Sequence, residues 1–382
     1  MWKRHRFEDL FQTRYPIVQG PMNNASPPAL VSAVSGAGGL GFLAASLLAP
    51  AAIDAAVGEI RRRTAKPFGV NLFVLPEVTV RPAQLEAAMF SLEPYRRLLG
   101  LPPATVPVKF CESFREQFDA LLDIAPPVVS FTLGIVDPSA VRRLHEVGSK
   151  VIGTATTVAE ARAWEAAGAD AICAQGSEAG GHRATFLGAM DQSCVGLMAL
   201  LPQMRPAVGL PIIAAGGIMT GRATMAAMML GADAVQLGSA FLHCPEAGIN
   251  ATWKAHLASA RDDSTRLSRS FSGRHARGIV NRYMRETDEH GVPDYPIQNA
   301  LTAELRAEAG RLGRGEFMSL WAGQAAGMGR SMPAGELVRT LAAEADEAAR
   351  WIATLEPMDP SPPRSRQAPP AFQPPASSSR TS

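Results

Sequence analysis

PIIAAGGIMTGRATMAAMMLGADAVQLGS, residues 211–239, contains the pattern that decides the fold. Two short apolar runs, at 211–217 and 233–239, flank an alanine-rich segment with a helical pattern. Nearly continuous apolar runs are typical of parallel strands that are covered by helices on both faces. The stretch therefore predicts a strand, a helix and a second strand parallel to the first.

The same unit recurs through the first two-thirds of the chain. Six further strands are expected at residues 16–22, 40–45, 67–74, 126–134, 150–156 and 170–176, with helical patterns between them. Eight strands that alternate with helices indicate an α/β fold, a closed (β/α)8 TIM barrel rather than an open sheet. In such a barrel the carboxyl ends of the strands build the active site.

The prediction divides the chain into a barrel over residues 1–239 and three segments that follow it. Within the barrel, residues 75–115 are too long for a simple connection, so we expect an insertion there. Residues 240–335 indicate a mainly helical cap over the barrel mouth, and 336–355 a final helix that closes on the barrel. The Pro- and Ser-rich segment 356–382 is expected to be disordered.

Composition and charge argue against several classes of protein. The formal net charge of +2, with 19% charged residues, gives no electrostatic reason to expect nucleic acid or an anionic membrane as a partner. The four cysteines form no CxxC pair, and no HxH or HExxH spacing is present, so we expect neither disulfides nor a metal site. The absence of a long apolar run or a secretory signal favours a cytoplasmic protein, expected as a monomer or homodimer.

The ends of the seventh and eighth strands carry a phosphate-binding signal. AAGGI ends the seventh strand before a helix, and QLGS, residues 236–239, ends the eighth. Barrels often bind phosphate with these two loops and a nearby helix N-terminus, and Ser239 would add a hydroxyl donor. The phosphate of a substrate and that of a cofactor are both compatible with this signal.

GAGGLG, residues 36–41, matches the dinucleotide-binding pattern GxGxxG by its letters alone. The pattern requires glycines between a strand and the following helix, whereas here they follow a helix and lead into a strand. We therefore interpret this stretch as a glycine C-cap and turn.

AQGSEAGGHR, residues 174–183, places His182 directly after two glycines at the end of the sixth strand. An imidazole, with a pKa of about 6.5, is suited to taking a proton near neutral pH. The other six histidines have no comparable setting. From the pattern alone, His182 is either a catalytic base or a residue that follows a turn, and Glu178 either orients it or is a surface carboxylate.

Several motifs, in their order along the chain, resemble those of the FMN-dependent nitronate monooxygenases, formerly called 2-nitropropane dioxygenases. They are PIVQGPM, FGVNLF, VVSFTLG, AQGSEAGGHR, IIAAGGI and DAVQLGSAFL. Downstream, SGRHARG (272–278), YPIQN (295–299) and SLWAGQ (319–324) resemble the class I members in particular. The resemblance extends from about residue 14 to residue 350.

The resemblance implies FMN at the carboxyl-terminal mouth of the barrel and His182, the histidine of GGHR, as the catalytic base. Carried over motif by motif, the FMN contacts would be Met22, Asn71, Gln175, Gly180, Gly217, Gln236, Leu237, Gly238 and Ser239. The implied reaction is the oxidation by O2 of alkyl nitronates, such as propionate 3-nitronate, and of nitroalkanes. Its products would be a carbonyl compound and nitrite or nitrate, and NAD(P)H would not be required.

The sequence departs from the family at the barrel mouth. Asn23 and Asn24 stand where small residues are typical, so we expect a narrower or more polar substrate pocket. Ala184 replaces the more usual glycine of GHRGTF, which is tolerated unless the backbone needs a positive φ.

Two alternative functions stay open. The first is an FMN-dependent NAD(P)H reductase of the enoyl-acyl-carrier-protein reductase type, which shares the barrel and a similar GGH segment. The second is a noncatalytic flavin- or phosphate-binding barrel.

Overall fold

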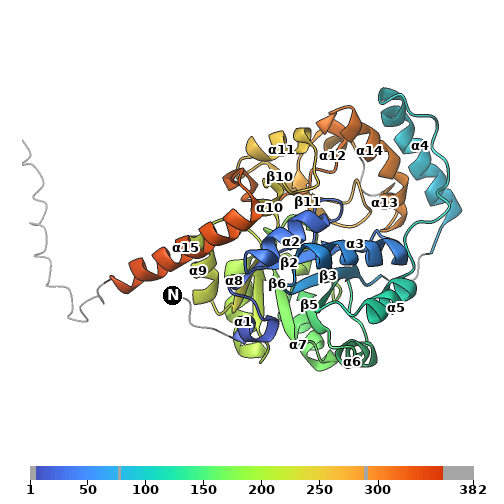
Figure 1. Ribbon diagram of the computed structural model, residues 1–382. Helices are drawn as coiled ribbons and strands as arrows, with labels where there is room; N and C mark the ends of the chain where they lie inside the picture. Colours follow the sequence, from blue (N-terminus) through green and yellow to red (C-terminus); the bar gives the residue numbers. More distant parts are fainter. Residues whose placement is uncertain (1–5, 76–78, 288–290, 356–382) are drawn as a thin grey trace, which may run out of the picture.

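The computed structural model describes residues 6–75, 79–287 and 291–355, and it contains a closed barrel of eight parallel strands (Figure 1). In barrel order the strands are β1 (Ile17–Gln19), β2 (Leu40–Ala44), β3 (Phe68–Phe73), β4 (Val128–Thr132), β5 (Lys150–Ala155), β6 (Ala171–Gln175), β8 (Ile212–Ala215) and β9 (Ala234–Leu237). Parallel pairing of β9 with β1 closes the barrel. The predicted TIM barrel and its eight strands are therefore confirmed. The predicted tail at 356–382 lies outside the described residues.

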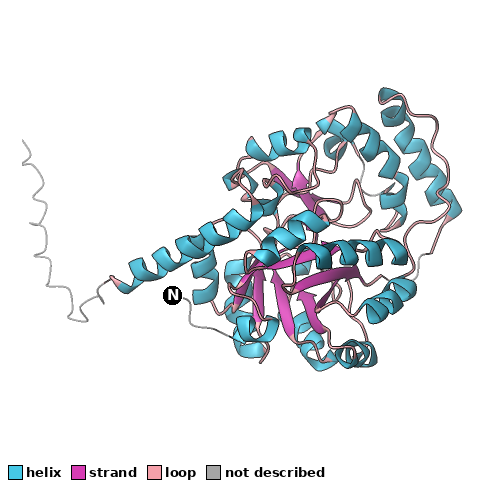
Figure 2. Ribbon diagram, viewed as in Figure 1, coloured by secondary structure: helices cyan, strands magenta, loops and turns pink. Residues whose placement is uncertain are grey.

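Helices cover the outside of the barrel (Figure 2). Those between successive strands are α2 (Pro28–Gly36), α3 (Pro50–Arg63), α5 (Phe114–Ile124), α6 (Pro138–Glu146), α7 (Val158–Ala167), α8 (Leu197–Met204) and α9 (Gly221–Met229). The eighth position in this ring belongs to α15 (Ala334–Ala353), which packs against α9 and α2. The chain therefore leaves the barrel after β9 and completes the helical ring only near its end.

Side chains alternate along the strands and form two apolar layers. On β9, Val235 and Leu237 belong to the large cluster between sheet and helices, whereas Ala234 belongs to the cluster inside the barrel. Phe7 and Phe11 of α1 (Arg6–Phe11) pack into the inner cluster. The inner cluster reaches from α1 at the amino ends of the strands to Ala215, the last residue of β8.

Two insertions form a cap over the carboxyl ends of the strands. The first holds α4 (Pro82–Leu98), and the second holds α10 (Ser239–Leu242), α11 (Ala251–Ala258), α12 (Arg282–Glu286), α13 (Ile297–Leu301) and α14 (Ala303–Arg311). Their buried side chains share one apolar cluster. Within it the ring centroids of Tyr95, on α4, and Tyr283, on α12, lie 4.9 Å apart. The two insertions, distant in sequence, thus pack into one unit.

The second insertion also contains two short strands, a detail that the expectation of a mainly helical cap at residues 240–335 did not include. β10 (Thr265–Ser268) pairs antiparallel with β11 (Ala276–Ile279), and β11 pairs on its other edge with β7 (Gly181–His182). β7 belongs to the connection after β6, so this sheet joins segments far apart in the sequence. A pairing of this kind leaves no periodic signal in either segment alone.

The glycines of GAGGLG form the turn between α2 and β2, as predicted. Gly38 has a φ of +100°, and its amide donates a hydrogen bond of 3.0 Å to the Ser35 carbonyl at the end of α2. All four cysteines are free. Among the described helices, none is both long enough and apolar enough for a membrane span.

Candidate active site

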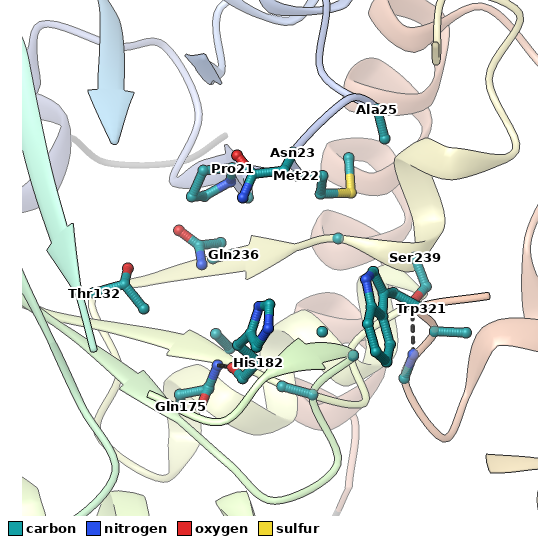
Figure 3. Close-up of a pocket in the computed structure, with 18 of the residues that line it drawn as sticks. Pro21, Met22, Asn23, Ala25, Thr132, Gln175, His182, Gln236, Ser239 and Trp321 are labelled. Atoms are coloured by element: carbon teal, nitrogen blue, oxygen red, sulfur yellow. Dashed lines mark hydrogen bonds between the residues drawn. The ribbon is translucent and has the colours of Figure 1, made fainter. Parts of the chain in front are cut away.

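A cavity at the carboxyl ends of the strands brings together residues from motifs that are far apart in the sequence (Figure 3). It is lined by His182 and by eight of the nine residues predicted to contact FMN, namely Met22, Asn71, Gln175, Gly180, Gly217, Gln236, Gly238 and Ser239. Asn23 and Asn24 also line it. Figure 3 shows Met22 and Asn23 on one side of this space, with His182 and Gln175 on the other.

Leu237, the ninth predicted contact, is not among the residues that line the cavity. Its side chain is 1% exposed and packs between the sheet and the helices. Successive side chains of a strand point to opposite faces, so Gln236 lines the cavity while Leu237 points away from it. The prediction treated QLGS as a block and did not take this alternation into account.

His182 is held in a short strand rather than on a flexible loop. In β7 it pairs with Ala276, and the Arg183 amide next to it donates 2.8 Å to the His275 carbonyl. Gly181 has a φ of +73°, and a Cβ added at Gly180 would lie 2.5 Å from the backbone carbon of Ala322. The two glycines therefore permit a turn and a close backbone approach to the SLWAGQ segment.

The side-chain amide of Gln175 fastens the residues around His182 to the end of β6. Its Nε2 donates to the His182 carbonyl at 3.0 Å. Its Oε1 accepts from the Ala184 amide at 2.9 Å and from Arg183 Nη1 at 3.2 Å. Gln175 therefore positions the backbone on both sides of His182.

A hydroxyl group fixes the orientation of the His182 ring. His182 Nε2 and Ser272 Oγ lie 3.0 Å apart, and the Ser272 hydroxyl also lies 3.0 Å from the Arg274 carbonyl, to which it donates. With its single proton given to that carbonyl, Ser272 Oγ accepts from Nε2–H of the histidine. This arrangement leaves the lone pair of the neutral imidazole on Nδ1.

The surroundings of His182 keep the ring neutral. Burial, together with the positive charges of Arg274 and Arg306, lowers the pKa of His182 to about 3. The aromatic rings of Phe73, Tyr295 and Trp321 surround it, with centroid distances of 5.7, 5.4 and 5.8 Å. These aromatic neighbours lie within recognised motifs, but sequence reasoning did not assign them to the site.

The loops after β8 and β9 offer polar groups to the cavity. Gly216 and Gly217 have φ values of +126° and +69°. Among the described residues, the amides of Gly217 and Ile218 have no protein acceptor. Ser239 Oγ accepts from the Gly323 amide at 2.9 Å, so its own proton is available to a ligand. This edge can therefore receive an anionic group, as the sequence suggested.

The asparagines of the mouth add polar atoms, as expected from the sequence. Asn24 has a φ of +62°, a left-handed conformation that asparagine tolerates better than most residues. The Oδ1 atom of Asn23 is buried and has no hydrogen-bond partner in the described part of the chain. Ala184 is not among the residues with positive φ, so alanine fits there without strain.

Glu178 has a structural role that differs from both interpretations of the sequence. Its carboxylate accepts from the Leu197 amide at 2.8 and 3.1 Å, at the first residue of α8. It therefore caps this helix. The described residues contain no group of three or more His, Cys, Asp or Glu side chains placed to hold a metal ion.

The sequence of this chain is similar to those of known enzymes. A family model described as nitronate monooxygenase matches residues 4–344. A protein of Staphylococcus aureus (strain MSSA476), named probable nitronate monooxygenase, is 39% identical over 344 residues, which are 89% of this chain and 97% of that protein.

Solved structures show the same similarity. The nitroalkane oxidase from Streptomyces ansochromogenes is 42% identical, with a TM-score of 0.84 over 90% of this chain and 99% of that one. FabK from Thermotoga maritima is 29% identical, with a TM-score of 0.73 over 92% of this chain and 99% of that one. Because the family model and these relatives span nearly the whole barrel and cap, the chain belongs to the nitronate monooxygenase family of oxidoreductases.

Proposed function

We propose that this enzyme binds FMN in the central cavity and uses O2 to oxidise alkyl nitronates to a carbonyl compound and nitrite or nitrate. Neutral nitroalkanes are also substrates, with His182 as the base that removes their carbon-bound proton. The observation that carries the proposal is a neutral imidazole, fixed by Ser272, on the wall of a cavity whose other edge offers free backbone amides.

The walls of the cavity fit the chemistry of FMN. The Gly217 and Ile218 amides and the Ser239 hydroxyl suit its phosphate, and the amide side chains of Asn71 and Gln236 suit its ring or ribityl chain. The buried Oδ1 of Asn23 requires a donor that the described residues do not supply. When bound, FMN would supply the redox chemistry of the oxidation.

The charges around His182 favour the product of proton removal. Nδ1 carries the free lone pair, so it is the atom that accepts the substrate proton. Arg274 and Arg306 lower the pKa of His182, which weakens it as a base, but the same positive charges stabilise a developing nitronate anion. Proton transfer is thus driven largely by stabilisation of the anion. A preformed nitronate needs no base.

Replacement of His182 by alanine tests the base assignment. We expect retained FMN, a loss of roughly 10²- to 10⁴-fold in turnover of nitroethane, and a much smaller effect on ethyl nitronate. Oxygen consumption measures both rates, and the flavin absorbance of the gel-filtered protein measures FMN content. Undiminished rates on both substrates would refute the assignment.

Anaerobic mixing separates the proposal from its two alternatives. Purified enzyme is mixed with propionate 3-nitronate or with NADPH while the flavin spectrum is followed. Bleaching by the nitronate alone supports the proposal, and rapid bleaching by NADPH supports a reductase. A flavin that responds to neither compound supports a noncatalytic barrel.

A further inference from the structure

A second cavity adjoins the central one, and the two share part of their walls. It has a volume of about 540 Å³, which is within the range of small-molecule sites. None of the nine residues predicted to contact FMN lines it. Six residues line both cavities, namely Asn24, Leu47, Trp253, Asn299, Arg306 and Ser319. The two cavities therefore meet at a junction that lies apart from the predicted cofactor contacts.

The outer end of the second cavity opens to solvent. Ala303 and Ala307 of α14 line it and are exposed. Lys109, Gly248 and Asn250, on the surrounding segments, line it and are exposed as well. The two alanines are small, so they leave space that a larger side chain would fill.

The inner end of the second cavity faces His182 across the mouth of the barrel. Asn24 and Leu47 follow β1 and β2, whereas His182 follows β6. In the closed ring of eight strands, β2 and β6 are four places apart and so lie on opposite sides. A molecule that enters over β2 therefore approaches the wall that carries the proposed base.

Hydrogen bonds fix one part of the junction. Arg306 Nε donates to Thr302 Oγ1 at 3.1 Å, and its Nη2 donates to the carbonyl and side-chain oxygens of Asn299 at 2.7 and 3.0 Å. The arginine is partly buried, and among the described residues no Asp or Glu forms an ion pair with it.

Trp253 and Leu47 are not held in this way. The indole Nε1 of Trp253 is buried and has no hydrogen-bond partner in the described part of the chain. The side chain of Leu47 has no polar atom. Rotation of either side chain therefore breaks no side-chain hydrogen bond, and the larger one, Trp253, has the greater effect on the width of the junction.

We propose that the second cavity is the entrance through which nitronates reach the reaction site, and that Trp253 is a specificity-determining residue that limits their width. The inference rests on the proposed function and narrows its substrate class to nitronates slender enough to pass the indole. Since kcat/KM cannot exceed the rate constant of substrate entry, a narrower entrance lowers it.

A bulky side chain in the second cavity tests the entrance. Ala303→Trp and Ala307→Trp each add an indole at an exposed helix position, so the fold should be retained. For both variants we expect kcat/KM with ethyl nitronate to fall by at least about tenfold, with FMN content unchanged. Arg311→Trp, on the same helix but outside both cavities, should match the wild type. Wild-type kcat/KM in both alanine variants would overturn the proposal.

Reduction of the bound flavin by dithionite separates this inference from the proposed reaction, because no nitronate takes part. Stopped-flow absorbance follows the bleaching of FMN without oxygen in wild type, Ala307→Trp and Arg311→Trp. Slower bleaching in Ala307→Trp alone supports the entrance even if nitronates are not oxidised. Equal rates in all three proteins would overturn it even if kcat/KM falls, since the indole would then act on substrate binding rather than on entry.

Two nitronates of different width test the role of Trp253. In Trp253→Ala we expect the ratio of kcat/KM for cyclohexyl nitronate to that for ethyl nitronate to rise about tenfold, because the wider junction admits the ring. Flavin absorbance of the gel-filtered variant shows whether FMN is retained. A ratio equal to that of the wild type would overturn the assignment of Trp253.

Discussion

The reactivity proposed for His182 depends on a single hydroxyl group. Ser272 is fully buried and accepts the Nε2–H of the ring, which leaves Nδ1 as the only basic nitrogen. Ser272 touches the base rather than the substrate, so it is a positioning residue. Its effect should therefore appear only where a proton has to be removed.

Ser272→Ala is expected to lower kcat/KM for nitroethane about fivefold, because one hydrogen bond of roughly 1 kcal/mol no longer selects the ring tautomer and orientation. Ethyl nitronate turnover and FMN content should stay close to wild type. Steady-state oxygen consumption with nitroethane and its deuterated form gives both the rate and the isotope effect, which should rise in the variant. Ser259→Ala, at an exposed position, is the control. An equal loss on nitroethane and ethyl nitronate would indicate a general structural role instead.

The residues of the site were predictable to different degrees. The motifs led to His182 and to most of the cavity lining, because each follows a barrel strand. The approach of Ser272 to His182 joins positions 90 residues apart, and no spacing rule shows such a contact. Arg306 was missed for a similar reason, since an arginine in an ordinary helical pattern becomes unusual only when its burial and lack of a carboxylate are seen.

At the level of secondary structure, the connection from β6 to α8 is anchored by a buried carboxylate. Glu160 of α7 is 0% exposed and accepts hydrogen bonds from the Phe186 and Leu187 amides at 2.6 and 2.9 Å. It also accepts from the Thr156 amide and hydroxyl, both at 2.6 Å. Four donors thus meet at one carboxylate, a few residues after His182.

Glu160→Ala should therefore destabilise the protein and disturb the site together. Removal of the carboxylate leaves buried donors unpaired, which we expect to lower the free energy of unfolding by about 3–5 kcal/mol. Nitroethane turnover should fall as well, because β7 loses one of its supports. Urea denaturation followed by circular dichroism measures the stability. Glu59→Ala removes an exposed ion pair and should cost less than about 1 kcal/mol. A similar small loss in both variants would contradict the anchoring role of Glu160.

The elements of the barrel were readable from the sequence because parallel strands leave continuous apolar runs. The small sheet was not, since β7 has only two residues and no period can be detected over that length. In addition, β7 pairs with β11, which lies far from it in the sequence. The sequence predicted a final helix that closes on the barrel, but not its place as the eighth helix of the ring, because a long cap segment separates α15 from β9.

At the level of the whole molecule, both the barrel and the cap contribute residues to the candidate active site. The barrel supplies the glycine-lined edge and the side-chain amides, while the cap supplies Ser272, Trp253 and Arg306. The cap also carries the positive charges of Arg274 and Arg306 that act on His182. Because α15 completes the helical ring after the cap, the cap is inserted between two parts of one packed unit.

The lowered pKa of His182 should affect how the stability of the whole protein depends on pH. The pKa is about 3 in the folded protein and about 6.5 in the unfolded chain, so the unfolded chain binds more protons between these values. Stability is therefore fully retained above pH 6.5 and falls as the pH is lowered toward 3. The contribution of His182 to this loss should reach about 2 kcal/mol at pH 5. For the same reason, the acid limb of nitroethane turnover should appear well below pH 6.5.

Comparison with His182→Asn isolates this contribution, because burial also lowers the pKa of His243 and gives a loss of the same sign in both proteins. Urea denaturation of the FMN-loaded proteins is measured from pH 7.5 to pH 4.5. We expect the free energy of unfolding to decrease less steeply in the variant, with the two curves diverging below about pH 6.5. Parallel curves over the whole range would show that His182 titrates normally in the folded protein. The positive charges of the cap would then not hold the base neutral.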